Sequence, residues 1–183
     1  MEALAARSTS RDFTPDTPGL SQAQLSNLLW ATYGVNRPDG RRTAPSANNL
    51  KEITVYVLLE RGAFLYDAEK HSLKPVVKSP ESKKPVGDIR SLAGKQAFAK
   101  YAPVTLLMVA DFSRRGGAEP DAAARELQGV NAGLIAQNAG LFCASEGLIG
   151  GVRMSLPYAE LSAALGLPKT HRIVLAYSVG GKN

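Results

Sequence analysis

The chain has 183 residues, of which 44% are hydrophobic and 21% are charged, and its formal net charge at pH 7 is +6. A chain of this length and composition is typical of one packed domain, which we expect to cover residues 1–183. One cysteine and two histidines exclude a disulfide scaffold and a zinc cluster.

The first distinctive segment is Arg7 to Arg11, which holds two arginines and three hydroxyl side chains in five positions. Both arginines share a face in either regular conformation, because a strand repeats every two residues and a helix every three to four. Two converging guanidiniums with hydroxyls between them predict a site for an oxyanion, most often a phosphate. A surface turn with solvated arginines explains this stretch equally well on its own.

The next element is a predicted helix over residues 20–36. It opens with Ser21 and Gln24 in the spacing of a capping box. Four residues then share one helical face, which we expect to pack in the core: Leu25, Leu28, Leu29 and Thr32.

A polar loop follows this helix over residues 36–49 and is rich in Pro, Gly, Asn and Asp. It is too long for a simple turn, which makes it a candidate functional loop. Its last two residues, Asn48 and Asn49, carry amides that both donate and accept hydrogen bonds, as the edge of a flavin ring requires. Asparagine pairs are also common as plain turn formers.

The middle of the chain predicts a β-meander. Ile53 to Glu60 is β-branched and aromatic, and Arg61 and Gly62 turn it into further short strands around a second turn at Ala68 to His71. Residues 78–94 then form a loop-like stretch. Its start is the densest basic group of the chain but also holds a glutamate and two prolines, so we expect a solvated loop and no nucleic-acid partner.

A short helix is predicted over residues 94–102, and Pro103 ends it. The following run, Val104 to Phe112, is continuously apolar and predicts a strand covered on both faces, at the centre of the sheet. Residues 120–148 form the longest predicted helix. Within it, Cys143 lies among apolar residues, so we expect a buried side chain rather than a reactive thiol.

The composition of the long predicted helix also indicates what its surface packs against. No charged residue lies between Glu126 and Glu146, but polar and small residues interrupt the run. This pattern favours a buried helix or a subunit interface, and we expect no membrane partner. The N-terminus has no apolar signal core, so we expect a cytoplasmic protein, although an exported form whose leader had been removed would show the same sequence.

The last third predicts a short strand or turn over residues 150–155, a helix over 157–167 and a closing strand over 171–183. The order of elements predicts an α+β fold, with helices packed on a mixed or antiparallel sheet. No Walker A sequence is present, and the only glycine cluster near a helix follows that helix, so neither a P-loop nor a dinucleotide fingerprint is predicted.

Four blocks of sequence, taken in order, resemble the FMN-dependent nitroreductase family, and most of all its short branch related to the thiazoline and oxazoline dehydrogenases. The blocks are residues 7–13, 37–57, 129–154 and 165–182, which together span nearly the whole chain. The resemblance implies a nitroreductase-like fold, with a central mixed or antiparallel sheet packed between helices. It also implies a homodimer with FMN at the subunit interface.

The resemblance further implies where the cofactor binds. Arg7, Thr9 and Arg11 correspond to residues on the FMN phosphate and on the pyrimidine side of the ring. Ser8 occupies a slot that is often a second basic residue, and Lys182 corresponds to a base that meets the phosphate.

Two other parts of the chain correspond to the surroundings of the flavin ring. Asn49, with Asn48 beside it, matches an asparagine that approaches the ring across the dimer. Gly150 to Ser155 matches a segment whose backbone N–H groups point towards N5 and O4, and many members have glycine at Ser155. The expected cofactor-binding residues are Arg7, Ser8, Thr9, Arg11, Asn48, Asn49, Gly151, Arg153, Met154 and Lys182.

The implied function is an FMN-dependent oxidoreductase that transfers hydride from NADH or NADPH to small electron-poor acceptors such as nitroaromatics or quinones. No catalytic side chain and no metal are expected, because the flavin carries the chemistry. Two alternatives stay open: a flavin-dependent dehydrogenase of another substrate, and a non-catalytic flavin- or anion-binding module. Residues 78–94 fall where the family varies its substrate-covering segment, and a plain surface loop is the other interpretation.

Overall fold

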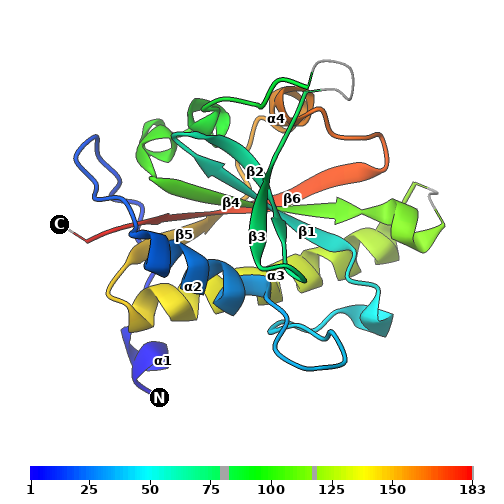
Figure 1. The fold of residues 1–183 in the computed structure, drawn as a ribbon, viewed down its shortest axis with the longest axis horizontal. Helices are drawn as coiled ribbons and strands as arrows, with labels where there is room; N and C mark the ends of the chain where they lie inside the picture. Colours follow the sequence, from blue (N-terminus) through cyan, green and yellow to red (C-terminus); the bar gives the residue numbers. More distant parts are fainter. Residues whose placement is uncertain (79–82, 117–118, 183) are drawn as a thin grey trace.

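The computed structural model describes residues 1–78, 83–116 and 119–182. Its described strands form one six-stranded sheet in the order β3-β2-β1-β4-β6-β5, and every neighbouring pair is antiparallel (Figure 1). The strands are β1 (Ile53–Leu59), β2 (Gly62–Asp67), β3 (Ser72–Pro75), β4 (Val104–Asp111), β5 (Ile149–Arg153) and β6 (His171–Gly180). The predicted α+β class is confirmed, and the sheet is antiparallel rather than mixed.

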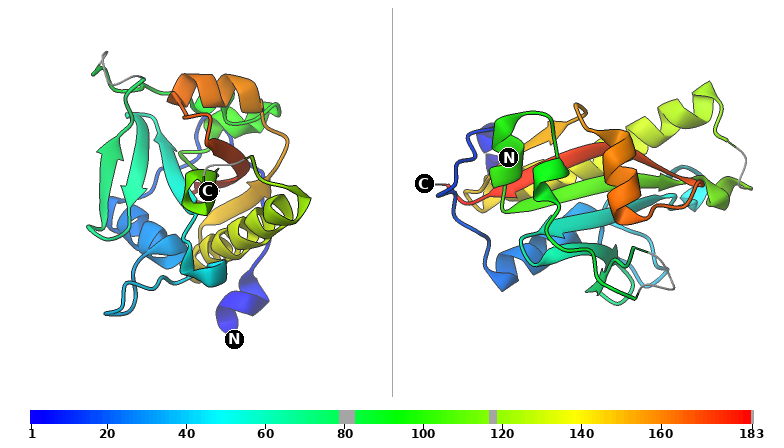
Figure 2. Two further views of the ribbon diagram at one scale, coloured as in Figure 1. Left: turned by 90° about the vertical axis from the view of Figure 1, so that its right-hand side faces the viewer. Right: turned by 90° about the horizontal axis from the view of Figure 1, so that it is seen from above.

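Helices lie on both faces of this sheet (Figure 2). The α-helices are α1 (Glu2–Ala6), α2 (Gln22–Tyr33), α3 (Ala122–Ser145) and α4 (Tyr158–Leu165). The short 3-10 helices are η1 (Ala47–Asn49), η2 (Arg90–Leu92), η3 (Ala97–Tyr101) and η4 (Phe112–Arg115). The helix predicted over residues 94–102 therefore forms as the 3-10 helix η3.

The predicted start of α2 is confirmed by its hydrogen bonds. The backbone N–H of Gln24 donates to Oγ of Ser21 at 3.1 Å, and the backbone N–H of Ser21 donates to Oε1 of Gln24 at 2.9 Å. This reciprocal pair satisfies two amide groups that the first turn of a helix leaves without partners. On the predicted core face, Leu28, Leu29 and Thr32 are buried, while Leu25 is half-buried.

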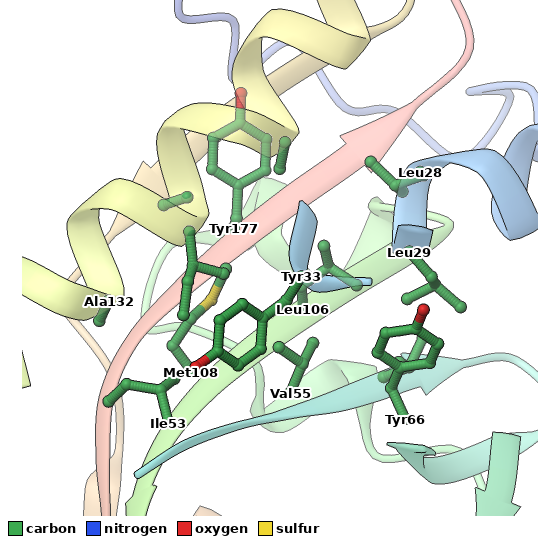
Figure 3. Close-up of a cluster of buried hydrophobic side chains, with 14 of the residues drawn as sticks. Leu28, Leu29, Tyr33, Ile53, Val55, Tyr66, Leu106, Met108, Ala132 and Tyr177 are labelled. Carbon is green, nitrogen blue, oxygen red and sulfur yellow. The ribbon is translucent and has the colours of Figure 1, made fainter. Parts of the chain in front are cut away.

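Strand β4 lies at the centre of the sheet, between β1 and β6, as its apolar run predicted. Alternate residues of β4 enter two cores: Leu106 and Met108 face α2 and α3, whereas Leu107 and Val109 face α4. Figure 3 shows part of the first core, where the side chains of α2 meet those of β1 and β4. Each face of the sheet is therefore covered by different helices.

Helix α3 begins at Asp121, whose carboxylate accepts a 2.8 Å hydrogen bond from the backbone N–H of Ala124. Cys143 is buried on the face that packs against the sheet, as predicted. The opposite face exposes Val130 (54%) and Leu134 (41%). In the described part of the chain, none of the helices is long and apolar enough to cross a membrane.

Candidate functional site

The arginine segment, residues 7–11, runs along the edge of the sheet beside β5. Arg7 follows α1 with an extended backbone (φ −62°, ψ 120°), so the extended conformation is the one adopted. The backbone N–H of Ser10 donates to the carbonyl of Gly150 at 3.0 Å, and Nη2 of Arg11 donates to the carbonyl of Val152 at 3.3 Å. Because β5 is the last strand of the sheet, this segment covers part of an otherwise open edge.

Alternation along the extended segment sends its side chains to two sides. One set, Ser8 and Ser10, lines a cavity of about 480 Å³. Ile149 and Lys182 also line this cavity, which we term the β5 pocket. Two of the expected cofactor-binding residues, Ser8 and Lys182, are thus brought together from opposite ends of the chain. Arg7, Thr9 and Arg11, which were expected at the phosphate and the pyrimidine side of the ring, do not line this pocket. Asp12 lines the same pocket, and its carboxylate accepts a 3.0 Å hydrogen bond from Oγ of Ser10.

The other set, Thr9 and Arg11, lies across Gly151. A Cβ atom at Gly151 would come within 2.9 Å of the carbonyl oxygen of Ser10 and 3.1 Å of Cγ2 of Thr9. Contacts this short do not fit a side chain without movement of the segment. Gly151 therefore allows the arginine segment to approach the backbone of β5 closely.

Arg153 is 4% exposed, and its side chain is engaged within the protein. Nη1 donates to the carbonyl of Ala93 at 2.6 Å, and Nη2 donates to Oγ of Ser178 at 2.7 Å. Burial, together with the nearby positive charge of Arg11, lowers the pKa of the guanidinium to about 10. The role expected of this position concerns its backbone N–H, whereas the side chain joins β5 to β6. Met154 follows β5 and is 65% exposed.

Asn48 and Asn49 lie far from the arginine segment within one copy of the chain. Figure 1 shows η1 beside the N-terminal half of α3, whereas α1 lies beside its C-terminal end. Both asparagines have positive φ values (53° and 54°), a conformation that asparagine tolerates better than most residues. A single copy therefore separates the two halves of the expected site.

The loop with these asparagines is held by a buried carboxylate that the sequence analysis did not single out. Glu52 is fully buried, and its Oε1 accepts a 2.7 Å hydrogen bond from Nδ2 of Asn131. Nη2 of Arg115 lies 3.4 Å from the same oxygen, and Oγ of Ser46 donates to Oε2 at 3.2 Å. The sequence did offer a signal for this network: Glu52 directly precedes an apolar strand. A carboxylate buried at such a position needs buried hydrogen-bonding partners.

A second cavity of about 320 Å³ lies beside Asn49, and we term it the arginine pocket. Four basic side chains line it: Arg37, Arg41, Arg42 and Lys51. The sequence placed its densest basic group at the start of residues 78–94, yet folding gathers these four side chains around one cavity. The signal available was the polar loop over residues 36–49, which the sequence marked as functional without assigning a role to its arginines.

Comparison with known proteins places the chain in a family. The model of the nitroreductase family matches residues 4–181. Two proteins described as “putative nitroreductase” are similar to the chain. One, from Methanocaldococcus jannaschii, is 32% identical over 136 residues; the match covers 70% of this chain and 66% of that protein, just under two thirds of its length. The other, a crystal structure from Ralstonia eutropha JMP134, has a TM-score of 0.87 and 36% identity, covering 100% of this chain and 82% of that one.

A more distant structure shares the fold. The NADPH:FMN oxidoreductase from Vibrio harveyi, complexed with NAD⁺, has a TM-score of 0.67 and 22% identity, and the match covers 100% of this chain and 68% of that one. The expected nitroreductase-like fold is confirmed by these matches. The family match over residues 4–181 establishes that the chain belongs to the nitroreductase family.

Proposed function

We propose that the chain is an FMN-dependent oxidoreductase that acts as a homodimer with two flavins at the subunit interface. It takes hydride from NADH or NADPH by a ping-pong route and delivers reducing equivalents to a small electron-poor acceptor, such as a nitroaromatic or a quinone. Membership of the nitroreductase family supports oxidoreductase activity of this type. The observation that carries the proposal is the arginine segment itself, which runs along the edge of β5 between the β5 pocket on one side and Gly151 on the other.

The chemistry of the arginine segment fits the phosphate of FMN, with contacts offered from its two sides. Ser8, Ser10 and Lys182 line the β5 pocket together with Asp12. Thr9 and Arg11 lie on the other side of the segment, across Gly151, and Arg7 is not among the residues that line the pocket. A hydrogen bond to a charged group contributes roughly 1.5 to 3 kcal/mol. Several such bonds would supply much of the roughly 8 kcal/mol that corresponds to micromolar affinity.

The homodimer is supported by the exposed face of α3. Val130 and Leu134 are exposed there, and a Cβ atom at Gly129 or Gly133 would meet nothing within 4 Å in one copy. An apolar helix face with small residues allows the close approach of a second backbone. The dimer would also account for the expected approach of Asn49 to the flavin from a second subunit, because one copy keeps Asn49 apart from the arginine segment.

The bound FMN would supply the redox chemistry, accepting reducing equivalents from the nicotinamide and passing them to the acceptor. The residues of the chain then bind and orient it. The positive charge of Arg11 would favour reduction, because reduced flavin carries negative charge on the pyrimidine side of the ring. Backbone N–H groups of residues 150–155 would orient the ring for hydride transfer.

The experiment that tests this function begins with the colour of the purified protein. We expect a yellow sample that bleaches when NADH or NADPH is added and regains its colour with a nitroaromatic or a quinone. A yellow sample that neither nicotinamide reduces would support a dehydrogenase of another substrate or a non-catalytic flavin-binding module. A colourless sample that cannot be loaded with FMN would contradict flavin binding altogether, and a stable monomer in sedimentation would contradict the dimer.

The site assignment has its own test. We expect Arg11→Ala to lower FMN affinity at least tenfold, about 1.4 kcal/mol. The matched control is Arg61→Ala, because Arg61 is an exposed arginine in the turn between β1 and β2. If Arg11→Ala retains flavin as well as the control does, the phosphate is not held by the arginine segment.

A further inference from the structure

The arginine pocket gathers positive charge without enough negative charge to balance it. Four basic side chains line it, and the acidic neighbour Asp39 pairs with Arg41 at 3.3 Å in a solvent-exposed contact. An exposed pair of this kind contributes little and is easily exchanged. Cations grouped around one cavity raise the local concentration of small anions.

The loop that carries these charges is built by its own hydrogen bonds. Val35 and Arg42 form an antiparallel bridge, and the backbone N–H of Thr43 donates to the carbonyl of Gly34 at 3.0 Å. Nη2 of Arg37 donates to the carbonyl of Arg42 at 2.7 Å, across the same turn. The backbone that carries the arginines is therefore ordered before a ligand binds. This order reduces the conformational entropy that is lost on binding.

Arg42 is the best-positioned donor. Its guanidinium lies over the ring of Tyr33, with Cζ 4.3 Å from the ring centroid. Stacking fixes the plane of a guanidinium and leaves its edge free for forked hydrogen bonds. Burial raises the pKa of Tyr33, so the ring beneath the guanidinium stays neutral at physiological pH. Nε of Arg42 is buried and has no hydrogen-bond partner among the described residues.

Lys51 closes the pocket from the other side. Its backbone has a positive φ of 51°, and its N–H donates to Oγ of Ser46 at 2.8 Å. This turn brings its Nζ to 3.7 Å from the position that a Cβ atom would occupy at Gly40, in the turn between Arg37 and Arg41. Because Asn49 also lines the pocket, the basic cluster adjoins a residue expected at the flavin ring.

We propose that the arginine pocket binds a phosphate monoester or pyrophosphate group of a small substrate and so selects anionic substrates for the flavin site. Forked arginine donors match phosphate oxygens, and a cavity of about 320 Å³ has the size of a small-ligand site. The selection step rests on the proposed flavin-dependent function, whereas the binding of phosphate does not. Two sources would present this chemistry: the phosphates of the nicotinamide donor and a phosphate carried by the acceptor.

Binding is tested with inorganic pyrophosphate on FMN-loaded protein, in which flavin occupies its own phosphate site. The test variant is Arg37→Gln/Arg41→Gln, because both residues are exposed. Since Arg37 also donates a hydrogen bond to the carbonyl of Arg42, Arg41→Gln alone is measured beside it, and it should weaken binding in the same direction. The matched control is Arg61→Gln/Lys70→Gln, which removes two exposed charges from the turns on either side of β2. We expect calorimetry to show at least tenfold weaker pyrophosphate binding in the test variant and no change in the control. Equal affinity in the two variants overturns the proposal.

The two sources are separated by kinetics. If the pocket holds the 2′-phosphate of NADPH, the test variant loses kcat/KM for NADPH at least tenfold more than for NADH. If it holds the acceptor, the KM for p-nitrophenyl phosphate rises at least tenfold while the KM for nitrobenzene is unchanged. Either outcome supports the proposal. A loss of at least tenfold in kcat/KM that is equal for NADPH and NADH would assign the pocket to the pyrophosphate that both donors carry. Unchanged kcat/KM for both donors, together with equal changes in KM for p-nitrophenyl phosphate and nitrobenzene, overturns the selection step.

A further measurement distinguishes failure of the proposed flavin function from failure of the phosphate pocket. If the protein cannot be loaded with FMN, pyrophosphate binding is measured on Arg7→Ala/Arg11→Ala, which removes the competing cations of the arginine segment. Binding that persists there and disappears when Arg37→Gln/Arg41→Gln is added keeps the phosphate pocket and rejects the flavin. Binding that survives all four substitutions rejects the pocket. A further variant, Arg42→Lys, keeps the charge but not the fork, and we expect it to weaken pyrophosphate binding at least threefold.

Discussion

Asn131 on α3 donates a 2.7 Å hydrogen bond to the carboxylate of Glu52, which lies fully buried at the start of β1. The same carboxylate lies 3.4 Å from Nη2 of Arg115 and accepts a 3.2 Å hydrogen bond from Ser46. Ser46 in turn accepts the backbone N–H of Lys51. One buried charge therefore ties the long helix to the loop that presents Asn48 and Asn49.

This relationship predicts a large effect of Glu52→Ala on stability. Removing the carboxylate leaves the amide of Asn131 and the guanidinium of Arg115 without their acceptor, which costs about 2–4 kcal/mol of unfolding free energy. Glu52→Gln keeps a hydrogen-bonding oxygen and should cost about half as much. Urea denaturation measures both, with Glu60→Ala as the exposed control at the end of β1. A loss below about 0.5 kcal/mol for Glu52→Ala would show that the network is not holding the loop.

A second prediction concerns the close approach at Gly151. Gly151→Ala places a methyl group 2.9 Å from the carbonyl oxygen of Ser10, so we expect the arginine segment to move away from β5. FMN affinity should fall at least tenfold, with a smaller loss of thermal stability. Gly87→Ala is the control, because a Cβ atom there would meet nothing within 4 Å. Unchanged flavin affinity would mean that the position of the segment does not determine binding.

A substitution at Ser8 should strengthen FMN binding rather than weaken it. It lines the β5 pocket with Lys182, and a cation at this position would add a charged contact to a bound phosphate. We expect Ser8→Lys to tighten FMN binding about fivefold at low salt, since a partly exposed ionic contact contributes about 1 kcal/mol. The gain should shrink at high salt. Ser72→Lys, at an exposed position on β3, serves as the control, and a Ser8→Lys affinity no better than that of this control would be the contrary result.

The thiol of Cys143 should be unreactive in the native protein. Burial raises its pKa to about 12, so almost no thiolate is present at neutral pH. We expect Ellman's reagent to label Cys143 only after denaturation. Rapid labelling of the native protein would contradict both its burial and the packing of α3 on the sheet.

His171 predicts a dependence of stability on pH. Burial lowers its pKa below the ordinary 6.5, and nearby Arg114 lowers it further, while Asp111 opposes the shift. The unfolded chain therefore takes up a proton more readily, and the free energy of unfolding falls as the pH drops below about 6.5. Urea denaturation at pH 7.5 and 5.5 should show a smaller loss in His171→Gln than in the wild type. The exposed His71 provides the control variant, and equal losses in all three proteins would exclude this role for His171.

Local patterns predicted most of the fold. The apolar run of β4 marked the centre of the sheet because a strand buried on both faces has no polar alternation. The spacing of Ser21 and Gln24 marked the start of α2, because a capping box is a contact between neighbours in sequence. Such features depend on residues only a few positions apart, which is why they are readable before the chain is folded.

The sites were less predictable because they depend on contacts between distant residues. The resemblance assigned Arg7, Thr9, Arg11 and Lys182 to the phosphate and the pyrimidine side of the flavin, but of these only Lys182 lines the β5 pocket, together with Ser8. Nothing in the spacing of Glu52 and Asn131 indicates that they meet, since their contact depends on the packing of α3 against the start of β1. The arginine pocket was missed for a different reason: Arg37, Arg41, Arg42 and Lys51 lie close in sequence, but they meet through an irregular loop whose conformation has no repeating pattern.

The length of α3 keeps the two parts of the proposed flavin site apart within one subunit. The helix spans 24 residues, or roughly 36 Å, with the arginine segment beside one end and the asparagine loop beside the other half. In the proposed dimer, neither subunit alone could enclose a flavin, because the helix keeps the two parts of its own site apart. Subunit exchange and cofactor release would then be a single coupled equilibrium, so that the concentration of protein would itself determine how much cofactor is retained.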